Sequence, residues 1–200
     1  MTISLSEILK SLPLRSETGP AWVQAVMADI DHFLADHASC ERKAHAAALM
    51  IVSRFPEHPD LQEKMIGLAR EELEHFEQVF LILRRRNITL GPDAVDQYVK
   101  NLLQHVRHPR DQHLLDRLLV AAMVEARSCE RFCQFANALP AGELKTFYIA
   151  FAQSESAHFP LFINTAKSLF PAAEVDRRLG EWLDLESSIM LALPYTAAVH

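Results

Sequence analysis

The chain has 200 residues, half of them hydrophobic, which is enough for one globular domain with a proper core. Its formal charge of −6 argues mildly against a nucleic-acid partner, because phosphate binding needs clustered cations, although this argument weakens if several acids bind metal. Only 5 glycines stand against 10 prolines, which fall mainly between apolar-periodic segments. This pattern favours long helices joined by turns over a sheet and predicts an all-α fold.

Apolar periodicity predicts the helices in chain order. After a short amphipathic opening at 6–12, helices are expected at about 21–35, 37–55, 61–86, 94–106, 112–139, 144–169 and 175–193. The first two join directly or after a break near Asp36, and prolines terminate the second because they cannot continue a helix. Four of these helices are long enough for a bundle core, with the shorter ones packed outside it. We therefore predict a single domain over residues 1–200, built as a four-helix bundle with peripheral helices.

The two halves of the chain resemble each other. The letters SCER occur at 39–42 and again at 128–131, and ELEHF at 72–76 is matched by ESAHF at 155–159. Each half is therefore predicted to be a helical hairpin, with SCER on its first helix and E-x-x-H-F on its second. A duplicated hairpin gives a four-helix bundle with pseudo-twofold symmetry.

The repeated E-x-x-H spacing is the motif that points to chemistry. About one such spacing is expected by chance in a chain of this composition, so a single copy would carry no weight. Here Glu72 with His75, and Glu155 with His158, lie at matching positions of the two hairpins, each within an apolar stripe. Residues three apart share a helix face. An ionised carboxylate on a buried face costs several kcal/mol unless it is paired, and divalent cations would pair with it.

A di-metal carboxylate bundle also needs one glutamate from each of the other two helices. Glu41 supplies the first, in a stripe of small apolar residues. For the second, local similarity favours Glu130, since it shares CER with Glu41. The distance along the helix to the proline that follows it favours Glu125. Glu41 lies 15 residues before Pro56, and Glu125 lies 15 residues before Pro140. We therefore choose Glu125.

These residues form a predicted metal site of four carboxylates and two imidazoles, which suits iron or manganese better than zinc. The predicted ligands are Glu41, Glu72, His75, Glu125, Glu155 and His158. His45 is expected to be structural, Tyr148 to pack in the core rather than form a radical, and Glu74 to face solvent, while the role of Glu71 is open. The remaining histidines, His37 and His200 among them, are expected at the surface or in turns.

At this point the residues resemble a known family. The segments DHASCERKAHAAAL, REELEHF, VEARSCERF and SESAHF, in this order and across nearly the whole chain, resemble the ferritin-like tRNA hydroxylases called MiaE. The resemblance places ligand roles on the same six residues. It also shows a departure from related bacterial di-iron monooxygenases, whose DExRH pattern becomes EELEH and SESAH here. The Asp and Arg that orient the ligands in those proteins are therefore absent.

The resemblance implies a non-haem di-iron monooxygenase. Its two iron ions would use O₂ and external electrons to hydroxylate the isopentenyl group of 2-methylthio-N6-isopentenyladenosine, next to the anticodon of a tRNA. The chain has no flavin or ferredoxin region, so a separate reductase is expected, and the chain itself is expected to be a monomer. The alternative is another ferritin-like di-iron oxidase or a ferroxidase, which would use the same number and kinds of metal ligands.

Contact with tRNA would require cations. The run Arg84, Arg85 and Arg86 is the first candidate. Further candidates near helix ends and loops are Lys100, Arg107, Arg110, Arg177 and Arg178, with Arg42 and Lys43 less certain.

Location follows from the cysteines and the N-terminal sequence. The three cysteines cannot all pair and none is in a CxxC unit, so neither a disulfide framework nor a zinc site is indicated. No signal peptide is evident, and no stretch approaches the roughly 20 apolar residues that span a membrane. A soluble, cytoplasmic protein is expected.

Overall fold

The computed structural model describes residues 3–200. Within this range the regular secondary structure is entirely α-helical, without a strand. The helices are α1 (Leu5–Ser11), α2 (Pro20–Ala28), α3 (Ile30–Arg54), α4 (Pro59–Arg85), α5 (Gln97–Leu103), α6 (Arg110–Ala138), α7 (Glu143–Glu155), α8 (His158–Leu169) and α9 (Ala172–Ala192). The all-α prediction is confirmed.

The chain divides into two compact units. The α3–α4 unit comprises residues 25–95 and 197–199, and the α6 unit comprises residues up to 24, 96–196 and 200. The boundary at residue 24 falls within α2. The expectation of one domain over residues 1–200 remains a prediction.

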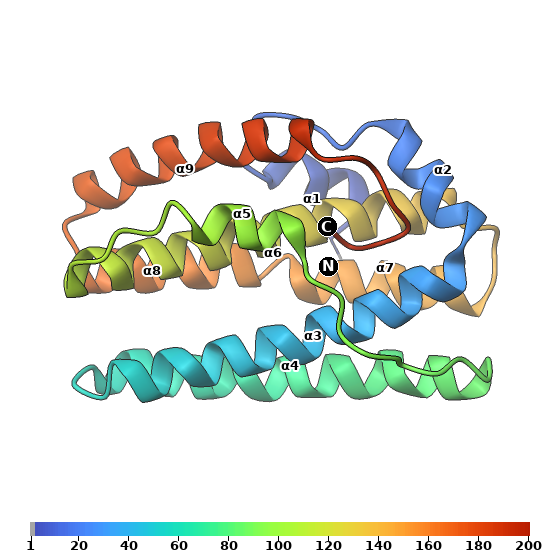
Figure 1. The fold of residues 1–200 in the computed structure, drawn as a ribbon, viewed down its shortest axis with the longest axis horizontal. Coiled ribbons are helices and arrows are strands. Elements are labelled where there is room, and N and C mark those ends of the chain that lie inside the picture. Colours follow the sequence, from blue (N-terminus) through green and yellow to red (C-terminus); the bar gives the residue numbers. More distant parts are fainter. Residues whose placement is uncertain (1–2) are drawn as a thin grey trace. The chain divides into compact units, whose positions relative to one another are not determined.

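The α3–α4 unit is an antiparallel helical hairpin (Figure 1). Helix α3 begins one residue after Asp29, whose side chain accepts a hydrogen bond from the backbone N–H of His32 at 3.1 Å. Of the two alternatives, direct joining and a break near Asp36, the second is wrong, because α3 runs through residue 36 and the chain breaks at Asp29 instead. An N-terminal aspartate satisfies backbone donors that the helix leaves open, and Asp29 performs this role seven residues earlier. Pro59 opens α4 at a position where its missing N–H is not needed.

The α6 unit is organised around its longest helix. Helices α1, α5, α7, α8 and α9 all pack against α6. Helix α5 is shorter than the expected 94–106, because Asp96 caps it by accepting the N–H of Val99 at 2.9 Å. Being covered on several sides, α6 buries polar residues as well as apolar ones.

A break separates α7 from α8, where the sequence predicted one helix over 144–169. That prediction is wrong, and Pro160 explains why. In a continuous helix residue 160 would donate its N–H to the carbonyl of Ser156, but proline has no N–H and its ring clashes with that carbonyl. The chain instead ends α7 at Glu155 and restarts at His158, which puts Pro160 in the first turn of α8. The hydroxyl of Ser156 donates to the carbonyl of Gln153 at 2.7 Å and closes the end of α7.

Candidate metal-binding site

The α3–α4 unit contains a buried cluster of two carboxylates and one imidazole. Glu41 comes from α3, and Glu72 and His75 come from one face of α4. The Nδ1 atom of His75 lies 3.9 Å from Oε2 of Glu41 and 3.9 Å from Oε2 of Glu72. The side chains of all three residues are more than 90% buried. They offer ligand atoms within 4.8 Å of one another, which is close enough for one ion.

The α6 unit contains a second cluster of the same composition. Glu125 comes from α6, Glu155 ends α7 and His158 begins α8. Nδ1 of His158 lies 3.5 Å from Oε2 of Glu125 and 2.9 Å from Oε2 of Glu155. Ligand atoms of these three residues also lie within 4.8 Å of one another. In both clusters the imidazole therefore turns Nδ1 toward the carboxylates.

The composition of each cluster fits a divalent cation. Two ionised carboxylates carry a charge of −2, and burying them without a partner would cost several kcal/mol per ion. One divalent ion would balance that charge within each cluster. Carboxylate oxygens with a single imidazole are the ligands expected for iron or manganese rather than for structural zinc.

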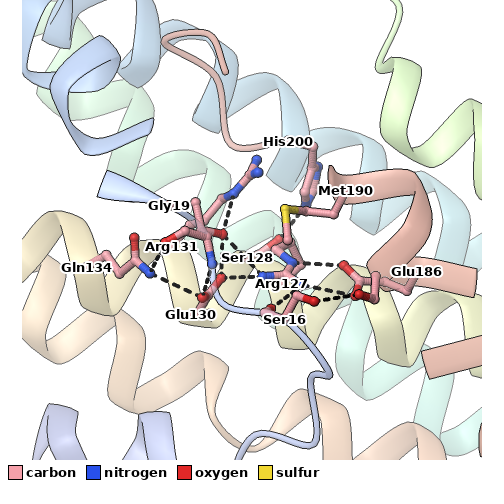
Figure 2. Close-up of polar contacts among 12 residues, drawn as sticks. Ser16, Gly19, Arg127, Ser128, Glu130, Arg131, Gln134, Glu186, Met190 and His200 are labelled. Atoms are coloured by element: carbon pink, nitrogen blue, oxygen red, sulfur yellow. Dashed lines mark hydrogen bonds and ion pairs between the residues drawn. The ribbon is translucent and has the colours of Figure 1, made fainter. Parts of the chain in front are cut away.

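The alternative glutamate, Glu130, lies in a different environment. At 3.6 residues per turn it lies on the other side of α6 from Glu125. Its carboxylate accepts hydrogen bonds from the backbone N–H and the hydroxyl of Thr18 at 2.7 and 2.6 Å. It also accepts one from Nη1 of Arg127 at 2.6 Å (Figure 2). Gln134 adds a fourth hydrogen bond at 3.1 Å. Glu130 therefore ties the segment before α2 to α6.

Arg127 continues this network on the side of α6 away from Glu125. Its guanidinium donates to both oxygens of Glu186 at 2.8 and 2.9 Å (Figure 2). Burial opposes the charge of Arg127, but the hydrogen bonds that its guanidinium donates to Glu186 outweigh this effect and raise the pKa of the guanidinium. For Arg131, by contrast, burial and then the charge of Arg127 lower the pKa to about 10. The network fixes α6 against α9 and the N-terminal segment.

Two histidines expected at the surface are buried, so that expectation is wrong for both. The side chain of His37 is fully buried, with Nε2 2.9 Å from Oε1 of Glu41. His200 lies between Ser128 and Asp96 and stacks on Tyr98 with ring centroids 4.9 Å apart. The signal for His37 was its spacing: it lies four residues before Glu41, on the buried face of α3. No periodic pattern surrounds His200, so its burial depends on contacts that the sequence does not reveal.

The remaining residues considered in the sequence lie in ordinary structural positions, in the core or at the surface. Tyr148 is buried among Phe132, Phe135, Phe147 and Phe151, with ring centroids 4.7 to 6.3 Å away, which is ordinary core packing. His45 donates from Nδ1 to the carbonyl of Ala69 at 2.6 Å and so links α3 to α4. Glu71 and Glu74 are exposed. All three cysteines are free thiols.

Several of the candidate RNA-binding cations are engaged in ion pairs. Arg107 and Arg178 both bind the carboxylate of Asp116, with contacts of 2.8 and 2.9 Å. Burial opposes ionisation of Asp116, but these hydrogen bonds outweigh it and hold its pKa well below its ordinary value. Arg86 binds Asp31 at 2.6 Å. Arg84 and Arg85 are exposed at the end of α4.

Comparison with known proteins identifies the family. The sequence model of the family described as tRNA-(MS[2]IO[6]A)-hydroxylase (MiaE) matches residues 4–200. The chain belongs to the MiaE family. A relative from Pseudomonas putida, described as tRNA 2-(methylsulfanyl)-N(6)-isopentenyladenosine(37) hydroxylase, is 38% identical over 160 residues, covering 80% of this chain and 78% of that protein. A protein of the same description from Salmonella typhimurium is 33% identical over 132 residues. That match covers 66% of this chain and about half, 48%, of the Salmonella protein.

A solved structure extends the comparison beyond MiaE sequences. The chain is similar to "Protein 43 with aldehyde deformylating oxygenase activity from Synechococcus", with a TM-score of 0.88 and 35% identity over 94% of each chain. The predicted ferritin-like fold is thereby confirmed. Among the described residues of this MiaE family member, no helix is both long and apolar enough to cross a membrane.

Proposed function

We propose that this protein is a tRNA hydroxylase that acts on the isopentenyl group of 2-methylthio-N6-isopentenyladenosine next to the anticodon, using O₂ and a reductant. The observation that carries the proposal is the pair of buried clusters, each with two glutamates and one histidine, in a chain that matches the MiaE family over residues 4–200. The named relatives act on this modified base in tRNA. The proposal extends their activity to this chain.

Each cluster is proposed to hold one iron ion. Glu41, Glu72 and His75 would bind one, and Glu125, Glu155 and His158 would bind the other, with each histidine coordinating through Nδ1. The bound irons would supply the oxidising chemistry, in which O₂, two external electrons and two protons convert a C–H bond to C–OH and release the second oxygen atom as water. The chain's own contribution is to fix the ligands and to exclude water around them, which their burial supports.

The same proposal covers the electron donor, the location in the cell, the oligomeric state and the contacts with tRNA. A separate reductase is proposed to deliver the electrons. A cytoplasmic location follows from a tRNA substrate, and a monomer is the expected state. Arg84 and Arg85 are proposed to bind tRNA phosphates, since they are exposed and adjacent. Arg86 is a weaker candidate because Asp31 already binds it.

The decisive experiment is aerobic turnover of iron-loaded protein with a chemical reductant and tRNA that carries the prenylated base. Mass analysis of the nucleosides should show the mass of one added oxygen atom, which ¹⁸O₂ should label. The matched control is Glu74→Gln, which changes an exposed glutamate of α4, against Glu72→Gln in the buried cluster. Unmodified nucleoside after turnover with fully loaded protein would exclude the hydroxylase function.

A second candidate is aldehyde deformylation, favoured by the Synechococcus structure, which is named for that activity. The same loaded protein should then release formate from a long-chain aldehyde. Formate without nucleoside oxidation would favour this second function over the first. An iron-oxidising storage protein would show neither product and would consume Fe(II) in large excess over the protein.

A further inference from the structure

A row of exposed side chains runs along α4 on the side of the helix away from its cluster residues. Three large apolar residues of this row, Ile66, Leu73 and Leu81, are 46%, 48% and 45% exposed. At 3.6 residues per turn they lie within an arc of about 80°, and the buried residues Glu72 and His75 lie outside that arc, on the other side of the helix. A single exposed apolar residue is ordinary, but several on one helix face indicate an interaction surface.

Charged residues of alternating sign occupy the same arc. They are exposed and follow one another at intervals of seven residues: Glu63, Arg70, Glu77 and Arg84. Seven residues span about 10 Å of helix, which is too far for these charges to pair with one another along α4. We call these four residues and the three apolar ones the α4 stripe. A partner that suits this stripe carries alternating charges in the opposite order.

The α4 stripe is complementary to its own reversed copy. Three couples of residues lie equally far from the point midway between residues 73 and 74: Arg70 with Glu77, Glu63 with Arg84, and Ile66 with Leu81. A twofold axis through that point generates an antiparallel α4 and puts the members of each couple opposite one another. Both charged couples then have opposite signs, and the third couple is apolar on both sides. Leu73, beside the axis, meets its own copy.

We propose that the α4 stripe binds a second copy of this chain, in a reversible homodimer whose two α4 helices lie antiparallel about a twofold axis beside Leu73. Each Arg70 then faces the partner's Glu77. A contact made by one helix from each copy buries less than the about 1,200–2,000 Å² of stable interfaces, so the dimer is weak. The proposed monomer is the form in dilute solution, and the dimer forms as the protein concentration rises. The dimer depends neither on bound metal nor on the identity of the substrate.

Glu74 limits the strength of this contact. It is exposed, follows Leu73 at the edge of the α4 stripe and lies close to the axis, so it approaches the partner's Glu74. Like charges this close oppose association. Glu74→Gln should therefore tighten the dimer by about two- to fivefold. Glu71→Gln, which removes an exposed charge farther round α4, should leave the dimer unchanged.

Sedimentation equilibrium of the whole chain over a wide concentration range measures the dimer, and circular dichroism checks the fold of each variant. Arg70→Glu and Glu77→Arg each put like charges opposite one another and should weaken the dimer at least about tenfold. The double variant Arg70→Glu/Glu77→Arg restores opposite signs in the reverse order, and its affinity should return to within about threefold of the wild type. The control is Arg15→Glu, which makes the same change of net charge outside α4 and should leave the dimer unchanged.

Cross-linking of introduced cysteines tests the antiparallel register. Position 73 lies beside the axis, so a short bis-maleimide should join two chains of Leu73→Cys. Position 66 lies about 11 Å from the axis along the helix, which puts its two copies about 22 Å apart, so Ile66→Cys alone should not cross-link. A mixture of Ile66→Cys and Leu81→Cys chains should cross-link, because these positions face each other. The wild type is the control for the three native thiols.

Three results would overturn the proposal. The first is a wild type that stays monomeric at the highest concentration, since the α4 stripe would then bind a different partner. The second is a dimer of wild-type strength in Arg70→Glu, or a double variant as weak as the single ones. The third is cross-linking of Ile66→Cys as efficient as that of Leu73→Cys.

An apolar variant gives an independent measurement if a charge reversal does not fold. Leu73→Asp places two like charges beside the axis and should abolish the dimer. Its matched control is Leu191→Asp on α9, where the leucine is 63% exposed. Equal association of these two variants would refute the contact through α4. Failure of iron binding or of tRNA oxidation changes none of these measurements, so the two proposals fail separately.

Discussion

Nδ1 of His158 lies 2.9 Å from Oε2 of Glu155, although one residue begins α8 and the other ends α7. The equivalent pair on the unbroken helix α4, His75 and Glu72, is separated by 3.9 Å. The break between α7 and α8 therefore accompanies the shorter contact. Since Pro160 prevents a continuous helix here, a residue outside the cluster influences the geometry of two proposed ligands.

The first prediction concerns this break. Pro160→Ala restores a backbone N–H and allows α7 and α8 to join through residue 156. We expect a metal-free protein at least as stable as the wild type, since alanine favours the helix. Metal affinity should fall about tenfold, because the Glu155–His158 pair loses its present geometry. Co(II) titration and thermal unfolding measure the two effects.

Pro171→Ala is the control for this change. Pro171 precedes α9 in the same unit and has no part in either cluster. Its replacement should leave Co(II) affinity unchanged. An equal loss of affinity in both proline variants would mean that the break at residues 156–157 has no particular role in positioning the ligands.

The second prediction concerns the buried carboxylates. Glu72→Gln and Glu155→Gln each keep the side-chain size but remove a buried negative charge. Each should stabilise the metal-free protein by about 1–3 kcal/mol, because an ionised carboxylate loses its hydration when it is buried and a neutral glutamine amide loses less. Each should also lower the bound iron measured after anaerobic loading. Urea unfolding gives the change in the free energy of unfolding without metal and with metal. A variant that is less stable without metal and still binds two irons would contradict the metal assignment.

Spacing and burial explain why the sequence could predict the clusters. The two E-x-x-H units occur at equivalent points of a repeated hairpin, and a helix places residues three apart on one face. The apolar stripe around Glu41 indicates that residue, and the equal distances of Glu41 and Glu125 from Pro56 and Pro140 favour Glu125 over Glu130. The structure puts Glu130 in a different network, but local similarity in SCER pointed to it. The same three residues, CER, therefore have different roles in the two halves. The first contains Glu41 of the buried cluster, and the second contains Glu130, which anchors the segment before α2.

What the sequence could not supply depends on long-range contacts. Arg107 and Arg178 both bind Asp116 and so join the loop before α6, α6 itself and α9. No local pattern in the sequence predicts these ion pairs. The burial of His200 against Tyr98 is of the same kind. The break before His158 is different, because Pro160 is a local signal for it, although the apolar periodicity of 144–169 predicts a single helix.

The third prediction concerns the charged network behind α6. Arg127→Leu would leave Glu186 and Glu130 without their guanidinium partner in a buried environment. We expect the free energy of unfolding to fall by about 3–5 kcal/mol. The double variant Arg127→Leu/Glu186→Leu should lose less free energy of unfolding than the single variant, because it also removes the buried carboxylate of Glu186. Urea unfolding provides the values.

The control for this network is an exposed ion pair of the same unit. Arg15 binds Asp184 at 3.0 Å, with both side chains more than half exposed. Arg15→Leu should change stability by no more than about 1 kcal/mol. A small effect of Arg127→Leu, comparable to that of Arg15→Leu, would show that the buried network contributes little to folding.

The fourth prediction concerns pH. Hydrogen bonds from Arg42 and then Ser39 lower the pKa of Asp93 from 3.8 to about 2, and thereby hold the 91–95 segment against α3. A lowered pKa in the folded state means that this stabilisation is complete above about pH 4 and is lost as the pH falls toward 2. An NMR titration of the Asp93 carboxyl should give a midpoint near 2. Arg42→Ala should raise it more than Ser39→Ala, and a wild-type midpoint near 3.8 would contradict the clamp.

The fifth prediction concerns tRNA binding by the end of α4. If Arg84 and Arg85 each neutralise a phosphate, Arg84→Ala/Arg85→Ala should weaken tRNA binding and reduce the slope of log K against log salt by about 0.7–0.9 for each contact. Arg86→Ala should reduce the slope less, since Asp31 already binds that guanidinium at 2.6 Å. Arg15→Ala, which breaks an exposed pair with Asp184, is the control for the loss of a surface arginine. Filter binding from low to high salt measures the slopes. An unchanged slope in the double variant would remove the end of α4 from the RNA-binding surface, because a lost phosphate contact must release fewer counterions.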